Sequence, residues 1–223
     1  MINKVTTDIE IILKSIPDGA RIMTSGFGLA GQPVELIEAL IDFGPKDLIV
    51  INNNAASGDR GLTNLLRAGL VKKMICSFPK ASNSTVFEDL YKARKIELDL
   101  VPQGNLACRI QAAGAGLGAV FTPTGYGTKI AEGKETRCID GKNYVLEYPI
   151  HADYALIYAH QADRWGNLIY RKAARNFGPI MAKAAKTTIA QVHDVVELGH
   201  LDPEHIITPG IFVQHVVRVG DIK

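Results

Sequence analysis

The sequence is poor in cysteine, and its three thiols form no recognisable pattern. Cys76, Cys108 and Cys138 are odd in number, and no two of them stand in a C-x-x-C pair. Their wide spacing argues against a zinc site and against a disulfide framework. We therefore expect three ordinary thiols in a reducing compartment, the cytoplasm, and no metal site.

The sequence also lacks an excess of charge and any long apolar run. Its 25 Lys and Arg residues nearly balance 23 Asp and Glu residues, which leaves a net charge of +2. This balance argues against a nucleic-acid partner. The apolar runs, such as residues 48–51, are too short to span a bilayer. Residues 1–19 carry Asp8, Glu10 and Asp18, so we expect no signal peptide there and no membrane partner.

What is present is the composition of an average globular protein. Of the 223 residues, 47% are hydrophobic and 22% are charged. Such a chain has enough apolar material for a packed core and is not expected to be disordered. We expect residues 1–223 to form a single domain.

The first half of the chain alternates helical and extended patterns. Apolar residues recur at helical spacing over 9–16, after a capping run at 6–8. Residues 21–25 are predicted as a strand, and a glycine-rich loop leads to a helix expected to begin at Pro33 and to be capped by Gly44. Further strands are predicted over 48–51, 71–76 and 98–101, and further helices over 62–68, from Ser82 or Ser84 to 93, and over 106–113. The alternation predicts an α/β fold with an open, mostly parallel, doubly wound sheet.

The last third of the chain is richer in strands. Asp140-Gly141 is a strong signal for a hairpin turn. Strands are predicted on both sides of it, over 136–139 and 143–148, on both sides of a turn at 163–167, over 154–159 and 168–170, and later over 187–192 and 211–219. We expect this strand-rich C-terminal part to pack on the same core.

Two segments are placed where an α/β sheet binds ligands. Residues 26–32 join a strand to a helix, and backbone N–H groups there favour anions. The segment fits neither a P-loop nor a convincing G-x-G-x-x-G motif, so a tight turn without a ligand remains an alternative. Gln103, just past a predicted strand, has a side-chain amide that can donate to a developing oxyanion; the alternative is a polar turn residue.

Two further segments carry weaker signals. Glycines crowd residues 114–118 and 122–128, which indicates close backbone approach to a ligand or to another chain. Residues 170–176 contain three cations, suited to phosphates or carboxylates or simply to solvent. No G-x-S-x-G or H-E-x-x-H motif is present, and the pair His151 and Asp153 could be coincidental, since such histidines are more often structural than functional.

Ordered segments along the chain resemble the class I coenzyme A transferases. Ile16-Pro17-Asp18-Gly19-Ala20, followed by residues 25–33, resembles the first signature of that family, with Ser25 in place of the usual first glycine. Further similar segments are 75–79, 97–107 around Pro102-Gln103-Gly104-Asn105, 122–125, 131–136, 163–167, 171–177 and 207–211. The resemblance spans nearly the whole chain and implies the fold that these transferases share with sugar-phosphate isomerases.

The resemblance implies a ping-pong reaction in which coenzyme A (CoA) enters as a thioester substrate and no cofactor is used. The family's nucleophilic glutamate lies in a Ser-Glu-Asn-Gly segment of a beta subunit, and this chain has no Glu followed by Asn. The chain therefore resembles the alpha half of an α2β2 hetero-oligomer. Gln103 takes the place of a substrate-contacting glutamine. The CoA-binding segment corresponds to Ser25, Gly26, Phe27, Gly28, Leu29, Ala30 and Gly31.

The substrate is indicated by a shorter segment. Residues 148–154 are most similar to the 3-oxoadipate transferases of aromatic-compound degradation, which implies succinyl-CoA as the donor; an acetoacetate-type transferase is the alternative. Cys108 and Gln111 replace a Glu and an Arg of relatives. A regulatory ligand-binding module is a further interpretation, but no DNA-binding helix pair precedes the domain. A stand-alone isomerase or hydrolase is another, but it would need a nucleophile or base within the chain, and none is convincing. An isolated alpha chain is expected to expose its apolar interface and to self-associate or precipitate.

Overall fold

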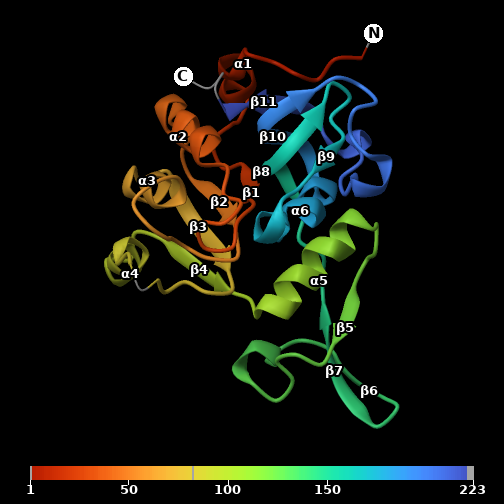
Figure 1. The fold of residues 1–223 in the computed structure, drawn as a ribbon. Helices are drawn as coiled ribbons and strands as arrows, with labels where there is room; N and C mark the ends of the chain where they lie inside the picture. The colour runs from red at the N-terminus through yellow and green to blue at the C-terminus, as the bar shows by residue number, and fades with distance from the viewer. Residues whose placement is uncertain (1, 82, 220–223) are drawn as a thin grey trace.

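The computed structural model describes residues 2–81 and 83–219, which form helices and strands in close alternation (Figure 1). The α-helices are α1 (Ile9–Lys14), α2 (Val34–Phe43), α3 (Leu62–Arg67), α4 (Val86–Lys92), α5 (Gln103–Gly114) and α6 (Gly178–Ala184). The strands are β1 (Arg21–Thr24), β2 (Leu48–Ile51), β3 (Val71–Cys76), β4 (Glu97–Leu100), β5 (Val120–Thr122), β6 (Thr136–Ile139), β7 (Lys142–Glu147), β8 (Ala152–Asp163), β9 (Leu168–Ile169), β10 (Ala185–Val196) and β11 (His215–Arg218). Short 3-10 helices are η1 (Lys129–Ala131), η2 (Lys172–Arg175), η3 (Pro203–His205) and η4 (Gly210–Phe212).

The main sheet has the order β11-β10-β8-β1-β2-β3-β4, and every neighbouring pair along this path is parallel. The chain builds outward from β1 to β4 and then returns to the other side of β1 with β8. The sheet is therefore doubly wound, as predicted, and its order reverses between β1 and β8. Ligands of open α/β sheets bind beyond the carboxyl ends of the strands at such a reversal.

Helices cover both faces of the main sheet (Figure 1). One apolar core packs α1 to α4 against the sheet, and the second packs α5 and α6 against the opposite face. The central strands carry apolar side chains on both faces of the sheet, because helices cover both faces. Ile22 and Met23 of β1, for example, are both fully buried but belong to different cores.

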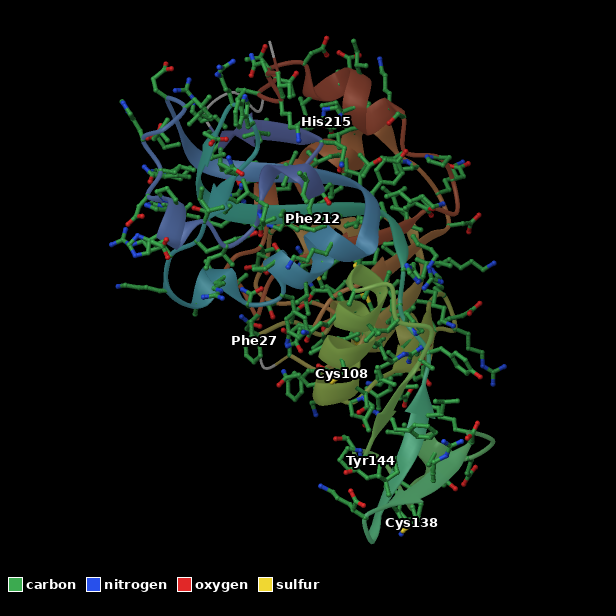
Figure 2. The ribbon with its side chains drawn as sticks, turned by 90° about the vertical axis from the view of Figure 1, so that its right-hand side faces the viewer. Phe27, Cys108, Cys138, Tyr144, Phe212 and His215 are labelled. Atoms are coloured by element: carbon green, nitrogen blue, oxygen red, sulfur yellow. The ribbon has the colours of Figure 1, made fainter. Side chains whose placement is uncertain are left out.

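A small antiparallel sheet of order β5-β7-β6 projects from the main body beside α5 (Figure 1). Its hairpin turns at Asp140 and Gly141, both with positive φ, as the Asp-Gly signal predicts. Figure 2 shows Cys138 and Tyr144 on this projection, far from the layered body. The strand-rich C-terminal part of the chain therefore contributes strands to both sheets. β5 to β7 form the projection, whereas β8, β10 and β11 extend the main parallel sheet and β9 pairs antiparallel with β8.

Two helix ends agree with the sequence predictions, and of the three capping candidates at 6–8 the structure selects Asp8. The carboxylate of Asp8 accepts from the N–H of Ile11 and caps α1. Gly44 ends α2 with φ of 63°, and its N–H donates to the carbonyls of Leu40 and Ile41. Both are standard solutions for the unpaired groups at helix ends.

Several predicted boundaries were wrong by a few residues. Pro33 caps α2 from outside, because its ψ of 70° is not helical although its carbonyl accepts from Ile37. Thr85, rather than Ser84, precedes α4; the alternative cap Ser82 lies outside the described residues. The helix expected over 106–113 begins at Gln103. The strand expected over 211–219 is shorter, since Gly210–Phe212 forms η4 first.

Among the described residues, no helix is long and apolar enough to cross a membrane.

Candidate active site

Ser25 links β1 and β8 at the point where the strand order of the main sheet reverses. The residue is fully buried, its N–H donates to the carbonyl of Leu156 at 3.0 Å, and its hydroxyl accepts from the N–H of Tyr158 at 3.0 Å. The same hydroxyl donates to the carbonyl of Gly31 at 2.6 Å. Ser25 thus ties the glycine-rich loop back onto the two strands, which gives a physical reason for a serine where glycine is usual in the family that the sequence resembles.

The glycine-rich loop, residues 26–32, is a tight turn that uses up most of its own donors. The N–H groups of Phe27 and Ala30 pair with each other's carbonyls, and the N–H of Gly28 donates to the side chain of Asn54. The N–H of Gly26 donates to the side chain of Asn176. Most of the backbone donors that the sequence indicated for an anion are therefore already bonded within the protein.

The loop instead presents two large apolar side chains to solvent. Phe27 is 52% exposed and Leu29 is 55% exposed, and both stand on the turn between β1 and α2. Figure 2 shows Phe27 projecting from the body of the molecule. Exposed apolar groups on a rigid turn are suited to apolar parts of a ligand or to another chain.

Three consecutive amides follow β2, and none of them was predicted as a site residue. Asn52 is buried and its amide donates to the backbone oxygens of Thr24 and Ser25, which binds the end of β2 to the end of β1. Asn54 accepts from the N–H of Gly28. The available signal was three asparagines placed directly after a buried parallel strand, at the ligand-binding edge of the sheet.

Asn53 is the centre of a side-chain cluster. Its Oδ1 accepts from the hydroxyl of Ser77 at 2.7 Å and from Nε2 of Gln103 at 2.9 Å. Asn53 is 1% exposed, whereas Gln103 lies on the exposed first turn of α5. The carboxyl ends of β2 and β3 and the start of α5 thus converge on one oxygen atom. Gln103 was a candidate from the sequence, whereas Asn53 and Ser77, which hold it, were not predicted as site residues.

A pocket of about 390 Å³ opens over this cluster. Its walls are apolar and its polar groups are amides and one hydroxyl. It is lined by Phe27, Gly28, Asn53, Asn54, Ser77, Phe78 and Gln103. No acid, base or thiol is among these residues, and the Ser77 hydroxyl is already committed to Asn53. The pocket can therefore position and polarise a substrate, but this lining supplies no activated nucleophile.

A buried ionic network joins α5 to the projecting sheet. Glu147 is 2% exposed, and its carboxylate accepts from Nζ of Lys134 at 2.7 Å and from Nδ2 of Asn105 at 3.0 Å. Nη1 of Arg109 lies 3.6 Å from the other oxygen. Asn105 also accepts from the hydroxyl of Thr122 at 2.7 Å. The network fixes the helix that carries Gln103 to the glycine-rich segment after β5.

The other glycines and cations noted in the sequence have different surroundings. A Cβ on Gly114 would lie 2.6 Å from Cβ of Lys183, so this glycine permits close packing of α5 on α6. By contrast, a Cβ on Gly116 or Gly118 would meet nothing within 4 Å. The basic segment 171–176 lies against the glycine-rich loop, because a Cβ on Gly31 would come 2.4 Å from the carbonyl oxygen of Ala174.

His151 and Asp153 do not form a catalytic pair. The carbonyl of His151 accepts from the Arg21 side chain, and the carboxylate of Asp153 accepts from the N–H of Arg21 at 3.0 Å and from Lys186 at 2.8 Å. These contacts join the amino ends of β1, β8 and β10, at the edge of the sheet opposite the pocket. The bond from Lys186, followed by that from the Arg21 N–H, lowers the pKa of the Asp153 carboxyl.

Cys108 and Gln111 lie on α5 but do not join Gln103. Five and eight residues after it, they are turned from it by about 140° and 80° around the helix axis, and both are exposed. Figure 2 shows Cys108 on the surface of α5. Their proximity to Gln103 in sequence therefore does not translate into a shared side-chain cluster.

Within residues 2–81 and 83–219, no three His, Cys, Asp or Glu side chains are grouped so that they could hold a metal ion.

Relatives of known name match the chain over nearly its full length. The A subunit of the 3-oxoadipate CoA-transferase of Pseudomonas putida is 67% identical over 220 residues, which cover 99% of this chain and 95% of that protein. The A subunit of the succinyl-CoA:3-ketoacid coenzyme A transferase of Helicobacter pylori is 46% identical over 216 residues, which cover 97% of this chain and 92% of that protein.

Among solved structures, glutaconate coenzyme A-transferase from Acidaminococcus fermentans has the same fold. Its TM-score is 0.83 at 21% sequence identity, over 96% of this chain and 75% of that chain. The family model described as "Coenzyme A transferase" matches residues 6–219. This match takes in the whole main sheet and every residue of the pocket. The chain therefore belongs to the coenzyme A transferase family.

Proposed function

We propose that this chain is the alpha (A) component of a CoA-transferase that moves CoA from succinyl-CoA to 3-oxoadipate. The observation that carries the proposal is the pocket at the sheet reversal, in which Gln103 is held by Asn53 while the lining contains no nucleophile. The higher identity to a relative named for 3-oxoadipate than to one named for 3-ketoacids favours 3-oxoadipate as the acceptor over acetoacetate.

In the proposed reaction the nucleophile is a glutamate of a partner beta subunit. Its carboxylate attacks the thioester carbonyl of succinyl-CoA, and the CoA thiolate leaves as an acyl-glutamyl anhydride forms. The thiolate then attacks the glutamyl carbonyl, which releases succinate and leaves a glutamyl-CoA thioester. The 3-oxoadipate carboxylate attacks this thioester, and the same steps in reverse give 3-oxoadipyl-CoA. Attack of a nucleophile on each of these carbonyls forms an oxyanion, which preorganised donors stabilise.

Gln103 is the proposed donor of this chain. A glutamine amide has two N–H groups, and one of them is engaged with Asn53. The second is left for a substrate or oxyanion oxygen in the pocket. Because Asn53 is itself buried and bonded to Ser77, the donor is held in place before the substrate arrives.

The segment Ser25–Gly31 is proposed to contact CoA through its side chains rather than through its backbone. Most of its N–H groups already donate within the protein, whereas Phe27 and Leu29 are more than half exposed. These two residues can pack on the apolar parts of the pantetheine arm. Ser25 acts from beneath, since it is fully buried and holds the turn in shape.

The test is reconstitution with the candidate beta subunit, the product of a reading frame that encodes a Ser-Glu-Asn-Gly segment. Each chain alone and the mixture are assayed with succinyl-CoA and 3-oxoadipate. We expect activity only from the mixture, and light scattering of the active species is expected to give an α2β2 mass. Activity with acetoacetate alone would correct the acceptor. Activity from this chain alone would contradict the placement of the nucleophile.

A further inference from the structure

The connection between β9 and α6 carries a group of cations without acidic partners. Arg171, Lys172 and Arg175 are all exposed or partly exposed, and none of them forms an ion pair with an acidic side chain of the described residues. Lys134 and Lys186, by contrast, each lie within 2.8 Å of a carboxylate. Cations gathered without counter-charges are suited to an anionic ligand.

A pocket of about 430 Å³ lies between η2 and η3, and two of these cations, Lys172 and Arg175, are among its lining residues. Lys172, Arg175 and His205 supply the polar lining, and Ile169, Tyr170 and Ile207 supply the rest. Tyr170 is anchored by a 2.8 Å hydrogen bond to the hydroxyl of Thr208. The nearby acid Asp202 lies 3.1 Å from Nδ1 of His205 and is occupied there. A pocket with apolar walls and two such cations is suited to a phosphate group, since partial removal of water strengthens the ionic contacts.

This pocket is built on the same segment that supports the glycine-rich loop. Oδ1 of Asn176 accepts from the N–H of Gly26 at 3.1 Å, and its Nδ2 donates to the carbonyl of Ala30 at 2.9 Å. The carbonyl of Ala174 lies so close to Gly31 that no side chain fits between them. The basic segment and the proposed CoA-contacting turn are thus one packed unit, with apolar side chains on one part and cations on the next.

The groups along CoA are complementary to this order of apolar side chains followed by cations. An acyl thioester and an apolar-to-polar pantetheine arm are followed by a diphosphate and a ribose phosphate. We propose that the pocket between η2 and η3 binds a phosphate group of the CoA thioester, with Lys172 and Arg175 as its cationic contacts. The inference rests on the proposed function, because it assumes that the thioester reaches the pocket lined by Gln103.

The test compares three succinyl thioesters in the complex of this chain with its beta subunit. Succinyl-CoA has every phosphate, succinyl-3′-dephospho-CoA lacks the ribose phosphate, and succinyl-pantetheine lacks all of them. For the double variant K172Q/R175Q we expect KM for succinyl-CoA to rise at least about tenfold, because two charge-assisted contacts are lost. We expect kcat to stay within about twofold and KM for succinyl-pantetheine to be unchanged, since neither residue touches the reacting atoms.

The dephospho compound identifies the phosphate. If its KM is also unchanged by the double variant, the ribose phosphate is bound in this pocket; if its KM rises, the diphosphate is. The matched control is K92Q/R94Q at the end of α4, which removes the same charge from an exposed site and includes a residue with positive φ, as Lys172 also has. This control is expected to leave all three KM values unchanged.

Two results would overturn the inference: an equal rise in KM for all three thioesters, or a change of less than about twofold in KM for succinyl-CoA.

Failure of the proposed function would give different results. If only acetoacetate is accepted, the three thioesters are assayed with acetoacetate as the acceptor, and the same comparison of KM values tests the inference. If no acceptor works, CoA and pantetheine are titrated into the wild-type and variant complexes by calorimetry. Absence of CoA binding by the wild-type complex would contradict both proposals.

Discussion

Nε2 of Gln103 donates to Oδ1 of Asn53 at 2.9 Å, across 50 positions of sequence. One residue starts α5 and the other follows β2, and the acceptor atom also receives the hydroxyl of Ser77. This relationship turns an exposed glutamine into a fixed donor over the pocket.

Replacement of Gln103 by alanine is expected to lower kcat of the reconstituted enzyme by about 10²-fold, the usual cost of losing one oxyanion donor. KM for succinyl-CoA should change much less, because the contact is made mainly in the transition state. The matched control is Gln111→Ala, which removes the same side chain from the same helix at an exposed position. Wild-type turnover by Gln103→Ala would remove Gln103 from the mechanism.

Asn53→Ala is expected to act through Gln103. Without its acceptor, the glutamine side chain gains rotamers, and we expect kcat to fall about tenfold. The double variant N53A/Q103A should then be no slower than Q103A, so that the two effects are coupled by at least about 1 kcal/mol. Steady-state kinetics of the four proteins give this coupling energy, with thermal melts to confirm that each is folded. If the loss of kcat in the double variant equals the product of the two single losses, Asn53 acts independently of Gln103.

Glu147→Gln is expected to destabilise the chain by about 2–3 kcal/mol. Loss of one partner of a buried ion pair costs about 3–5 kcal/mol, and the cost is lower here because Lys134 is one-third exposed. Urea unfolding of the complex measures the change. Glu135→Gln is the control, since Glu135 and its partner Arg137 are both more than half exposed and such pairs contribute about 0–1 kcal/mol. Equal effects of the two substitutions would contradict the importance of the buried network.

The three thiols are expected to differ in reactivity. Burial raises the pKa of the Cys76 thiol to about 12, and the thiolate is the reactive form. Maleimide labelling of the folded chain near neutral pH should therefore modify Cys108 or Cys138, which are exposed, and leave Cys76 untouched. After denaturation all three should react. Peptide mass spectrometry locates the label, and modification of Cys76 in the folded chain would place that residue outside the core.

Asp153 is expected to make the stability depend on pH in the acid range. Its folded-state pKa is lowered by Lys186 and then by the N–H of Arg21, so its contribution is complete above the ordinary pKa of about 3.9 and is lost as the pH falls through the lower folded value. Asp153→Asn should therefore be less stable than wild type near neutral pH, and the difference should shrink as the pH falls below the ordinary pKa of about 3.9.

The measurement for Asp153 is the urea midpoint of both proteins across this pH range. Lys186→Gln should reproduce only part of the loss, because the Arg21 N–H still donates to the carboxylate. A stability difference between wild type and Asp153→Asn that is the same at every pH would contradict the assignment.

Local patterns in the sequence were sufficient for most elements, and they indicated one residue of the candidate site. The capping run 6–8, of which Asp8 is the actual cap, the terminating Gly44 and the Asp140-Gly141 turn act on their own neighbours, and these predictions were confirmed. Gln103 was selected because it follows a strand at the ligand-binding edge and takes the place of a substrate-contacting glutamine in the family, and its role stays a prediction. Asn53 and Ser77 were missed, because a polar residue after a strand is common and only its long-range partners distinguish it.

The sequence by itself determined the alternation of strand and helix, the parallel doubly wound sheet and, through its ordered similar segments, the family. It did so because helix caps, turns and apolar periods depend on residues a few positions apart. Only the tertiary structure decided that β8 returns beside β1, that most donors of residues 26–32 are satisfied within the protein, and that Asn53 holds Gln103. These features arise from contacts between distant segments, and no local pattern records which buried polar group will meet which partner.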